Sequence, residues 1–374
     1  MNLKKAITSV CLGALLLTGG CGQNQSNTQQ KQETTEQNTA QAWEVAGVET
    51  EASSENGDPS QAEASRDIFA MDTYMTVTAF GENADAAVDA AQAEIERLDA
   101  LLSTGNGDSE IAKLNASGTA ELSADAGYLV ERALELNEET DGAFDIAIYP
   151  VMEAWGFPSQ NYQVPSDELL QERLALADAS QIIYDAEARE ISFGKDGMEI
   201  DLGGIAKGYT SARIMDIFKS CGITSGLVNL GGNVQVLGVK TDGSKWRIAV
   251  QSPDGESDYL GVLSVSDKAV ITSGGYERYF EQDGKTYHHI IDPKTGYPAE
   301  NGLTSVTIVS ADGTLADGLS TSLFIMGKEK AAEFWRAHSD EFDAILLADD
   351  GTLYVTEGIA DDFSTELPAE VISR

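Results

Sequence analysis

Short β-rich segments follow one another through much of the chain, and this succession constrains the fold more than any other feature. Strands that alternate with helices would indicate parallel βαβ units, whereas strands in runs are typical of antiparallel sheets. We therefore predict an α+β fold with mostly antiparallel sheets and packed helices. The expected strands are residues 73–80, 181–184, 190–193, 226–230, 246–251, 260–265, 305–309, 344–347 and 353–357.

Helical periodicity is clearest directly after the first of these strands. Asn83 is a suitable N-cap, and the apolar residues after it, from Ala84 to Leu98, recur at helical spacing. No internal linker is visible in residues 66–374, so we predict one folded domain there, with two closely packed lobes as the alternative. Further helices are expected at residues 124–139, 166–177, 207–221, 315–326 and 329–338.

The N-terminal residues are typical of a targeting signal. Two lysines precede an apolar run over residues 6–17, and small residues then lead to Cys21. A bare secretory signal begins in the same way but ends in a small-residue site without a cysteine. The arrangement resembles a bacterial lipoprotein signal, although Thr18 stands where a leucine is usual. We expect a signal peptide at residues 1–20 and lipidation of Cys21, with palmitate among its acyl groups.

The segment from Cys21 to residue 65 is polar and acidic. After Cys21 it carries one basic residue, Lys31, against eight acidic ones. Such a composition cannot bury enough apolar surface to offset the entropy lost on ordering. We expect residues 21–65 to be a disordered linker that tethers the domain to the extracytoplasmic side of a bacterial membrane.

Charge and composition exclude several classes of protein. The chain has 62 acidic and 24 basic residues, a formal net charge of −38, which would repel nucleic acid. Apolar runs are shorter than the about 18 residues that a membrane-spanning helix needs, which excludes a polytopic membrane protein. Three cysteines exclude a disulfide scaffold and a four-cysteine zinc site.

Glycine pairs mark three places where the backbone could approach a ligand closely. The first pair, Gly203-Gly204, is expected between a strand and a helix, with Lys207 four residues on. Helix N–H groups and a lysine could bind phosphate there, although neither a Walker A nor a G-x-G-x-x-G motif is present. The alternative is a tight turn followed by a surface lysine. The other pairs are Gly231-Gly232 and Gly274-Gly275.

Two of the three histidines, His288 and His289, are adjacent. An imidazole could act as a general base near neutral pH. Neighbouring residues of a strand point to opposite faces, so we expect one of the two to enter a site and the other to be structural. A zinc site would need further ligands at metal spacing, and the sequence does not offer them.

A third centre combines Asp317 and Thr321 near the start of an expected helix. Their spacing of four residues places a carboxylate and a hydroxyl on one helix face. With backbone carbonyls they would form an all-oxygen set that suits Mg²⁺ rather than zinc. The alternative is an aspartate that simply stabilises the helix N-terminus.

Taken together, these motifs resemble the FAD:protein FMN transferases, the ApbE family once called thiamine biosynthesis lipoproteins. The resemblance extends from Ala70 to Gly327. The matching motifs are Met71-Asp-Thr, Ser109 to Asn115, Gly142-Ala-Phe-Asp145, Trp155-Gly-Phe157, Asp201 to Tyr209, Asn229 to Asn233, Thr272 to Arg278, His289 to Pro293, Thr295-Gly296, Ser305-Val-Thr307 and Ala316-Asp317.

The resemblance implies the transfer of FMN from FAD to a threonine or serine hydroxyl of an acceptor protein, with release of AMP. It implies Mg²⁺ bound by Asp317, Thr321 and the carbonyl of Gly204, with His289 as the base and Lys207 assisting at the pyrophosphate. The acceptor would be a membrane or extracytoplasmic redox protein. The residues implied to line the FAD site are Met71, Ala143, Phe144, Asp145, Asp201, Lys207 and Ile291.

The early FAD motif departs from the family pattern. Gly105 follows Ser103-Thr104 where family members commonly carry a tyrosine. Tyr128, Tyr276 and Trp155 are therefore the alternatives for an aromatic that stacks on FAD. Two other functions are compatible with the same residues: a Mg²⁺-dependent FAD pyrophosphatase, and a lipoprotein that binds FAD without turnover.

Overall fold

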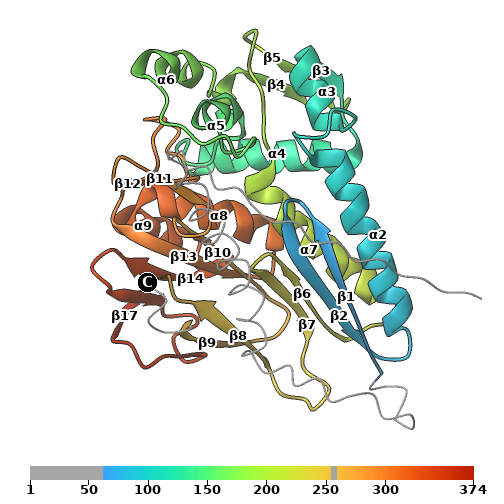
Figure 1. Ribbon diagram of the computed structural model, residues 1–374. Coiled ribbons are helices and arrows are strands. Elements are labelled where there is room, and N and C mark those ends of the chain that lie inside the picture. Colours follow the sequence, from blue (N-terminus) through green and yellow to red (C-terminus); the bar gives the residue numbers. More distant parts are fainter. Residues whose placement is uncertain (1–61, 254–258) are drawn as a thin grey trace, which may run out of the picture. The chain divides into compact units, whose positions relative to one another are not determined.

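A nine-stranded sheet dominates the structure, a computed structural model that describes residues 62–253 and 259–374 (Figure 1). Its strands pair antiparallel except for the last two, which are parallel. The predicted α+β class with mostly antiparallel sheets is confirmed. The strand order is β1 (Glu63–Ala70), β2 (Thr73–Phe80), β6 (Ser225–Leu230), β7 (Asn233–Gly238), β10 (Ala269–Gly274), β13 (Leu303–Ser310), β14 (Phe342–Ala348), β15 (Leu353–Thr356) and β17 (Ala369–Ile372).

Three smaller sheets complete the β structure of the described residues. The first is β3 (Thr119–Glu121), β5 (Glu190–Phe193) and β4 (Ile182–Asp185); the second is β16 (Phe363–Ser364), β9 (Tyr259–Val265) and β8 (Trp246–Gln251); the third is the hairpin of β11 (Tyr279–Gln282) and β12 (Lys285–His288). Every strand expected from the sequence is present, with its ends shifted by two residues at most.

The helices include every one expected from the sequence. Two further short helices, α3 and α5, and two 3₁₀ turns were not expected. The helices are α2 (Ala84–Leu102), α3 (Glu110–Ser117), α4 (Ala124–Glu139), α5 (Tyr149–Trp155), α6 (Asp167–Leu174), α7 (Gly203–Ser220), α8 (Gly313–Met326) and α9 (Lys328–Ala337), with 3₁₀ turns η2 (Ile146–Ile148) and η3 (Ala179–Gln181).

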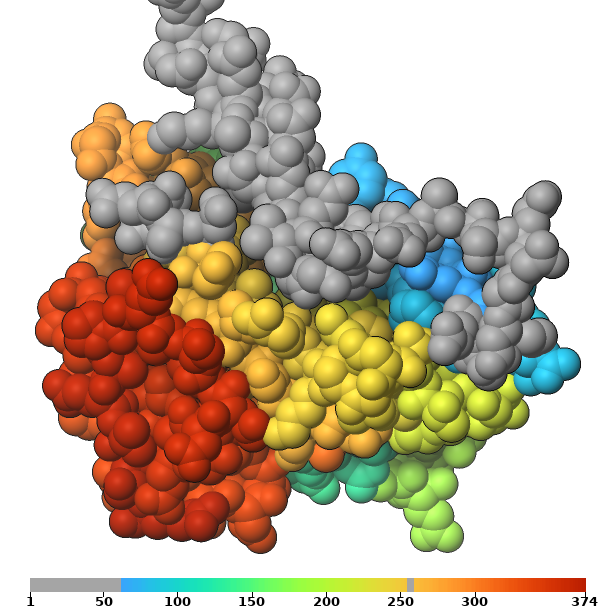
Figure 2. Space-filling view, turned by 90° about the horizontal axis from the view of Figure 1, so that it is seen from below, coloured from blue at the N-terminus to red at the C-terminus, as the bar shows by residue number. Residues whose placement is uncertain are grey.

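The two faces of the large sheet bury different layers. On β13, Ile308 packs into the core beneath the helices, whereas its neighbour Val309 packs against the sheet of β8 and β9. This alternation follows from the two-residue period of a strand. Figure 2 shows the second layer, where the red C-terminal strands lie beside the yellow segments around β8. The described residues belong to one compact unit.

Two details of the N-terminal part differ from expectation. Arg66 was expected to begin the domain, but it lies inside β1, whose first residue, Glu63, pairs with Phe80. Asn83 does occupy the N-cap position of α2, yet its side chain does not cap the helix. It donates instead to the carbonyl of Cys221, and so it ties the start of α2 to the end of α7.

Two hairpin turns meet at one end of the large sheet. Met71 and Asp72 connect β1 to β2, and Gly231 and Gly232 connect β6 to β7. The side chain of Thr73 lies so close to Gly231 that a Cβ there would be 2.3 Å from the threonine hydroxyl. None of the helices that the structure describes is both long and apolar enough to span a bilayer. The predicted signal peptide, Cys21 and almost all of the linker lie outside the described residues.

Candidate active site

Helices α7 and α8 cross in close contact at this end of the sheet. Gly208 on α7 and Gly313 on α8 make the contact possible, since a Cβ on Gly208 would lie 2.1 Å from the carbonyl oxygen of Gly313. Glycine allows this approach because it has no side chain. The crossing places Asp317, one turn further along α8, against the first turns of α7.

Asp317 is buried and has a fixed orientation. The amide of Gly208 donates to its Oδ2 at 2.7 Å, and the side-chain amide of Asn233 donates to its Oδ1 at 2.9 Å. Burial raises the pKa of Asp317, while the charge of Lys207 and these donors act in the opposite direction. A carboxylate kept in such surroundings is well placed to bind a cation.

Thr321 follows Asp317 by one helical turn and lies beside β10. Its hydroxyl is 3.2 Å from the hydroxyl of Ser273, which is itself 2.7 Å from the hydroxyl of Ser320. Ser320 donates to the carbonyl of Asp317. The predicted pair on one helix face is therefore present, and neighbouring hydroxyls orient it.

The carbonyl of Gly204 is the third predicted metal ligand. An α-helix would direct the amide of Gly208 at this carbonyl, but that amide also donates to Asp317. Gly204 itself packs against the ring of Phe144, 3.1 Å from where a Cβ would be. A carboxylate, a hydroxyl and a carbonyl are oxygen ligands that suit Mg²⁺, which commonly retains waters and substrate phosphates as further ligands. The residues therefore fit this ion.

Gly203-Gly204 was expected to follow a strand directly, and this expectation was wrong. Residues 194–202 are not in a strand, and α7 begins at Gly203 itself. Asp201 accepts from the amide of Gly203 at 2.9 Å and so stabilises the free helix N-terminus. Loss of hydration raises the pKa of Asp201, against the charge of Arg278.

The tip of the β1–β2 hairpin reaches the same place (Figure 1). Met71 and Asp72 have φ angles of 49° and 58°, in the left-handed region that bulky residues rarely adopt. Asp99 on α2 accepts from the amide of Met71 at 3.1 Å, and the sulfur of Met71 lies 3.9 Å from the hydroxyl of Thr210 on α7. Backbone strain of this kind is concentrated at functional sites.

The two adjacent histidines have different surroundings. His288 contacts Phe324 edge-on and the carbonyl of Ala299, so it packs in the interior. His289 lies with its Nδ1 3.2 Å from the carbonyl of Arg278. Loss of hydration, together with the charge of Arg278, lowers the pKa of His289 to about 3. This imidazole is therefore neutral at physiological pH, and its pKa would have to rise for it to act as a base.

The other residues predicted to line an FAD site are largely buried. Ala143, Phe144 and Ile291 are each less than 7% exposed. Both oxygens of Asp145 accept backbone amides, from Ala147 at 2.7 Å and Ala179 at 3.1 Å. Burial raises the pKa of Asp145 to about 6. The side chains of these residues are therefore packed or already hydrogen-bonded rather than free.

Three residues of the site had no role in the sequence interpretation. Asn233 orients Asp317. Glu277 and Arg278 follow β10, and both interact electrostatically with the site, Glu277 with Lys207 and Arg278 with His289. Loss of hydration raises the pKa of Glu277 to about 7. The sequence signal that could have indicated Glu277 and Arg278 is the pair Gly274-Gly275, because it marks where β10 ends.

The aromatic alternatives for stacking on FAD are not equivalent. Trp155 is completely buried and donates its ring N–H to the carbonyl of Gly296, so it is excluded. Tyr128 is 40% exposed and packs against Tyr209. Tyr276 is half-buried beside Glu277, with its ring over Gly274.

A cavity of about 420 Å³ lies beside the last turn of α8 and along α9. Ala143 and Asp292, the neighbour of Ile291, are among its lining residues, together with Lys294 and Lys330. Lys294 forms an ion pair of 2.8 Å with Asp141. The cavity therefore adjoins one of the predicted FAD positions, Ala143. No group of three or more His, Cys, Asp or Glu side chains that could hold a metal ion is present in the described ranges.

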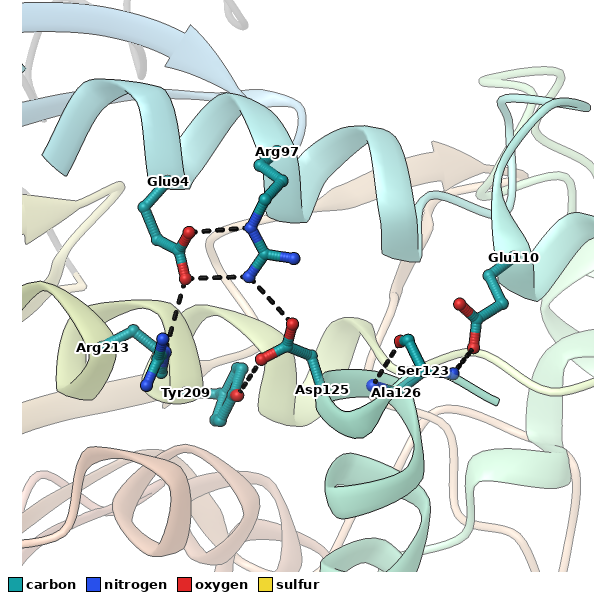
Figure 3. Close-up of polar contacts among 8 residues, drawn as sticks. All are labelled: Glu94, Arg97, Glu110, Ser123, Asp125, Ala126, Tyr209 and Arg213. Carbon is teal, nitrogen blue, oxygen red and sulfur yellow. Dashed lines mark hydrogen bonds and ion pairs between the residues drawn. The ribbon is translucent and has the colours of Figure 1, made fainter. Parts of the chain in front are cut away.

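A polar network holds α7 against α2 and α4 (Figure 3). Arg97 pairs with Glu94 and with Asp125, both at 2.8 Å, and Glu94 also pairs with Arg213 at 3.3 Å. Tyr209, two residues beyond Lys207, donates its hydroxyl to Asp125. Because Tyr209 and Arg213 are on α7, the network fixes the rotation of the helix that carries Lys207.

Replacing Arg97 should therefore reduce stability in a pH-dependent manner. The hydrogen bond to Arg97 lowers the pKa of Glu94. Burial alone would raise the pKa of Asp125, but the hydrogen bonds from Tyr209 and Arg97 outweigh burial, so the pKa of Asp125 is lowered too. Such carboxylates stabilise the fold above their unfolded pKa values and lose this effect as the pH falls. We expect Arg97→Met to cost about 1–2 kcal/mol at pH 7, allowing for solvent screening, and less at pH 3.

Urea unfolding at the two pH values measures this difference. Arg132→Met is the matched control, because the Arg132–Glu135 pair joins neighbouring turns of α4 only. An equal loss of stability in both variants, or no change with pH, would contradict the role of the network.

Known proteins resemble this chain in sequence and in structure. The model of the ApbE family matches residues 71–346. An FAD:protein FMN transferase from Klebsiella pneumoniae is 37% identical over 257 residues, which are 68% of this chain and 79% of the relative. Another, from Treponema pallidum, is 34% identical over 320 residues, 80% of this chain and 88% of the relative.

Solved structures show the same likeness. The ApbE protein of Thermotoga maritima superposes with a TM-score of 0.76 at 32% identity, over 80% of this chain and 99% of that one. The flavin transferase ApbE of Vibrio cholerae superposes with a TM-score of 0.73 at 29% identity, over the same shares of the two chains.

Proposed function

This chain belongs to the ApbE family, and from that premise we propose that it is an FAD:protein FMN transferase whose reaction takes place where α7 and α8 cross. The observation that carries the proposal is the buried carboxylate of Asp317, oriented by Gly208 and Asn233 toward an oxygen-rich, partly cationic site. Binding of FAD without turnover would not need such a carboxylate.

The reaction is a substitution at phosphorus. The oxygen of a threonine or serine hydroxyl on the acceptor forms a bond to the phosphorus of the FMN half of FAD. The bond between that phosphorus and the bridging oxygen breaks, and AMP leaves with the electron pair. The acceptor hydroxyl loses its proton, and negative charge grows on the phosphate oxygens as the bonds exchange.

Mg²⁺ is the cofactor that we propose for this site, held by Asp317, the hydroxyl of Thr321 and the carbonyl of Gly204. When bound, it would neutralise charge on the pyrophosphate. Lys207 contributes a second positive charge, and its field already acts on Asp317 and Glu277. In a chain with a formal net charge of −38, these cations counter the repulsion of an anionic substrate.

His289 is the proposed proton acceptor. It is neutral, half-buried and beside Arg278, with one ring nitrogen near a backbone carbonyl. The carbonyl contact fixes the ring, so that the other nitrogen can face the hydroxyl. An anionic pyrophosphate bound nearby would raise the low pKa of His289 and make it a stronger base.

FAD would lie along the buried residues on either side of this centre. Met71 and Asp201 stand near the start of α7, whereas Ala143, Phe144, Asp145 and Ile291 form a more buried wall. Because the oxygens of Asp145 already accept backbone amides, we assign it the role of shaping this wall. Tyr276 is the aromatic that we favour for stacking on FAD, since it lies beside Glu277 within the site.

We also propose that lipidated Cys21 anchors the enzyme to the extracytoplasmic side of a bacterial membrane. The support is the sequence alone: a basic start, an apolar run and small residues before the cysteine. The acceptor would then be a membrane or extracytoplasmic redox protein, which presents its hydroxyl within reach of the tethered domain.

The function is tested with the full chain, FAD, Mg²⁺ and a small folded domain that bears an exposed threonine of the flavinylated type. Intact mass should show a gain of one FMN on the acceptor, with one AMP released per transfer, and EDTA should stop both. AMP release without a gain in mass would identify a pyrophosphatase, and FAD binding without AMP would identify a binding protein.

In the same assay, His289→Ala should transfer FMN at least about 100-fold more slowly but still bind FAD. His338→Ala is the matched control, because the His338 ring stacks on Phe334 and contacts the Phe334 carbonyl at the end of α9, away from the site. An unchanged rate in His289→Ala would remove the imidazole from the mechanism.

A further inference from the structure

Two large aromatic side chains are exposed side by side on the β1–β2 hairpin. Phe69 is 62% exposed and Tyr74 is 66% exposed, and they are paired directly across the two strands. Their rings meet edge to face with centroids 5.0 Å apart. Exposed single apolar residues are common, but a contiguous exposed aromatic pair is typical of an interaction site.

The pair is not needed for the core of the protein. On the opposite face of the same hairpin, Ile68, Ala70 and Met75 are buried in the cluster beneath α2. Because residues alternate between faces, Phe69 and Tyr74 point away from this cluster. β1 is also an edge strand of the large sheet, so a partner could approach the pair from the side.

The turn between these two residues reaches the active site, so the pair lies next to the site along the hairpin. Only Ala70, Met71, Asp72 and Thr73 separate the two aromatic residues along the chain. Within that turn, the sulfur of Met71 lies 3.9 Å from Thr210 of α7, and the charge of Asp72 acts on Asp201. Asp72, Gly203 and Arg278 are all exposed, which makes this side of the site open to a large substrate.

We propose that Phe69 and Tyr74 form the docking surface for the acceptor protein. This rests on the proposed function, because the acceptor hydroxyl must enter the site and the protein around it must then cover the rim. Tyrosine and phenylalanine provide much contact area with little loss of conformational freedom. Asp67 and Asp72 flank the pair and are exposed, so the matching face of the acceptor is apolar at its centre and neutral or basic around it.

The test replaces both aromatic residues by threonine, which retains the preference for strand. The probe is the soluble domain of an acceptor that the unchanged enzyme flavinylates, identified by its gain of one FMN in mass. Transfer rates are measured against acceptor concentration at saturating FAD. Phe69→Thr/Tyr74→Thr should raise the KM for the acceptor at least about 10-fold, with kcat and the affinity for FAD changed less than about twofold.

Ile183→Thr/Val371→Thr is the matched control, since these residues are 65% and 55% exposed on strands of other parts of the structure. It should leave the KM for the acceptor unchanged. An unchanged KM in the aromatic double variant would overturn the proposal while the proposed function stands. A loss of FAD affinity would assign the pair to the flavin, and a change in sedimentation would assign it to a second copy; both would overturn it. Absence of FMN transfer by the unchanged enzyme would overturn both proposals.

Discussion

Asp317→Ala should reduce FMN transfer by a factor of about 1,000 or more. The variant removes the only carboxylate among the three proposed Mg²⁺ ligands and leaves the side-chain amide of Asn233 and the backbone amide of Gly208 without their acceptor. Loss of a charged ligand and of the electrostatic stabilisation that depends on it commonly costs several kcal/mol at the transition state, where each about 1.4 kcal/mol is tenfold in rate. Intact mass of the acceptor against time measures the rate.

The control for this prediction is on the same helix. Asp312 is the N-cap of α8, where its side chain accepts the amides of Thr314 and Leu315. Asp312→Ala should cost about 1 kcal/mol of stability and leave transfer within a few-fold. If both variants lost activity equally, Asp317 would act by stabilising the helix. A second variant, Asp317→Asn, keeps the size of the side chain but removes its charge. If raised Mg²⁺ concentrations restored neither the FMN transfer rate nor the stabilisation by bound ligand to this variant, the loss of activity would still be assigned to the carboxylate itself.

The large elements could be predicted because their sequences carry strong local signals. The helix from Ala124 to Glu139 and the strand from Thr73 to Phe80 have the bounds expected from periodicity. β1 was not expected, since as an edge strand it alternates polar and apolar residues that also occur in linkers. Its pairing with β2 depends on a neighbour in space rather than on its own composition.

The same distinction applies to the candidate site. Asp317 and Thr321 could be placed on one helix face because the spacing of four residues is local. Asn233 could not be placed, because its role depends on its contact with Asp317, which lies 84 residues further along the sequence. Asp145 likewise accepts from Ala179, 34 residues away, and this long-range bond occupies an oxygen that would otherwise be free for FAD.

Local rules failed where tertiary contacts replaced them. Asn83 has the right type and position for a cap, but its side chain binds Cys221. The segment before Gly203 has the hydrophobicity of a strand, with Met198, Ile200 and Leu202 buried in alternation. The backbone of this segment forms its hydrogen bonds with a side chain instead of a strand: the amide and carbonyl of Ile200 each bond to the side chain of Asn115. A strand forms only where its backbone can pair with the edge of another strand. Because this segment pairs with a side chain, it is not a strand.

Gly208→Ala should destabilise the protein by about 3 kcal/mol, although alanine is normally the better residue in a helix interior by about 1 kcal/mol. A Cβ at this position would lie 2.1 Å from the carbonyl oxygen of Gly313 and 2.5 Å from the Cβ of Asp317. The first of these atoms is backbone, so the two helices would have to separate. Asp317 would then lose its bond to the amide of Gly208, and transfer would fall together with stability.

Gly204→Ala is the comparison that isolates this effect, because it lies one turn earlier on the same helix. Its added Cβ would meet only the ring of Phe144, at 3.1 Å, and a ring can move by a few tenths of an ångström. We expect its stability to stay within about 1 kcal/mol of the unchanged protein, since the gain in helix propensity offsets the tighter contact. Urea unfolding followed by circular dichroism gives both values. If Gly208→Ala were as stable as Gly204→Ala, α7 and α8 could not cross at the distance that brings Asp317 to the first turns of α7.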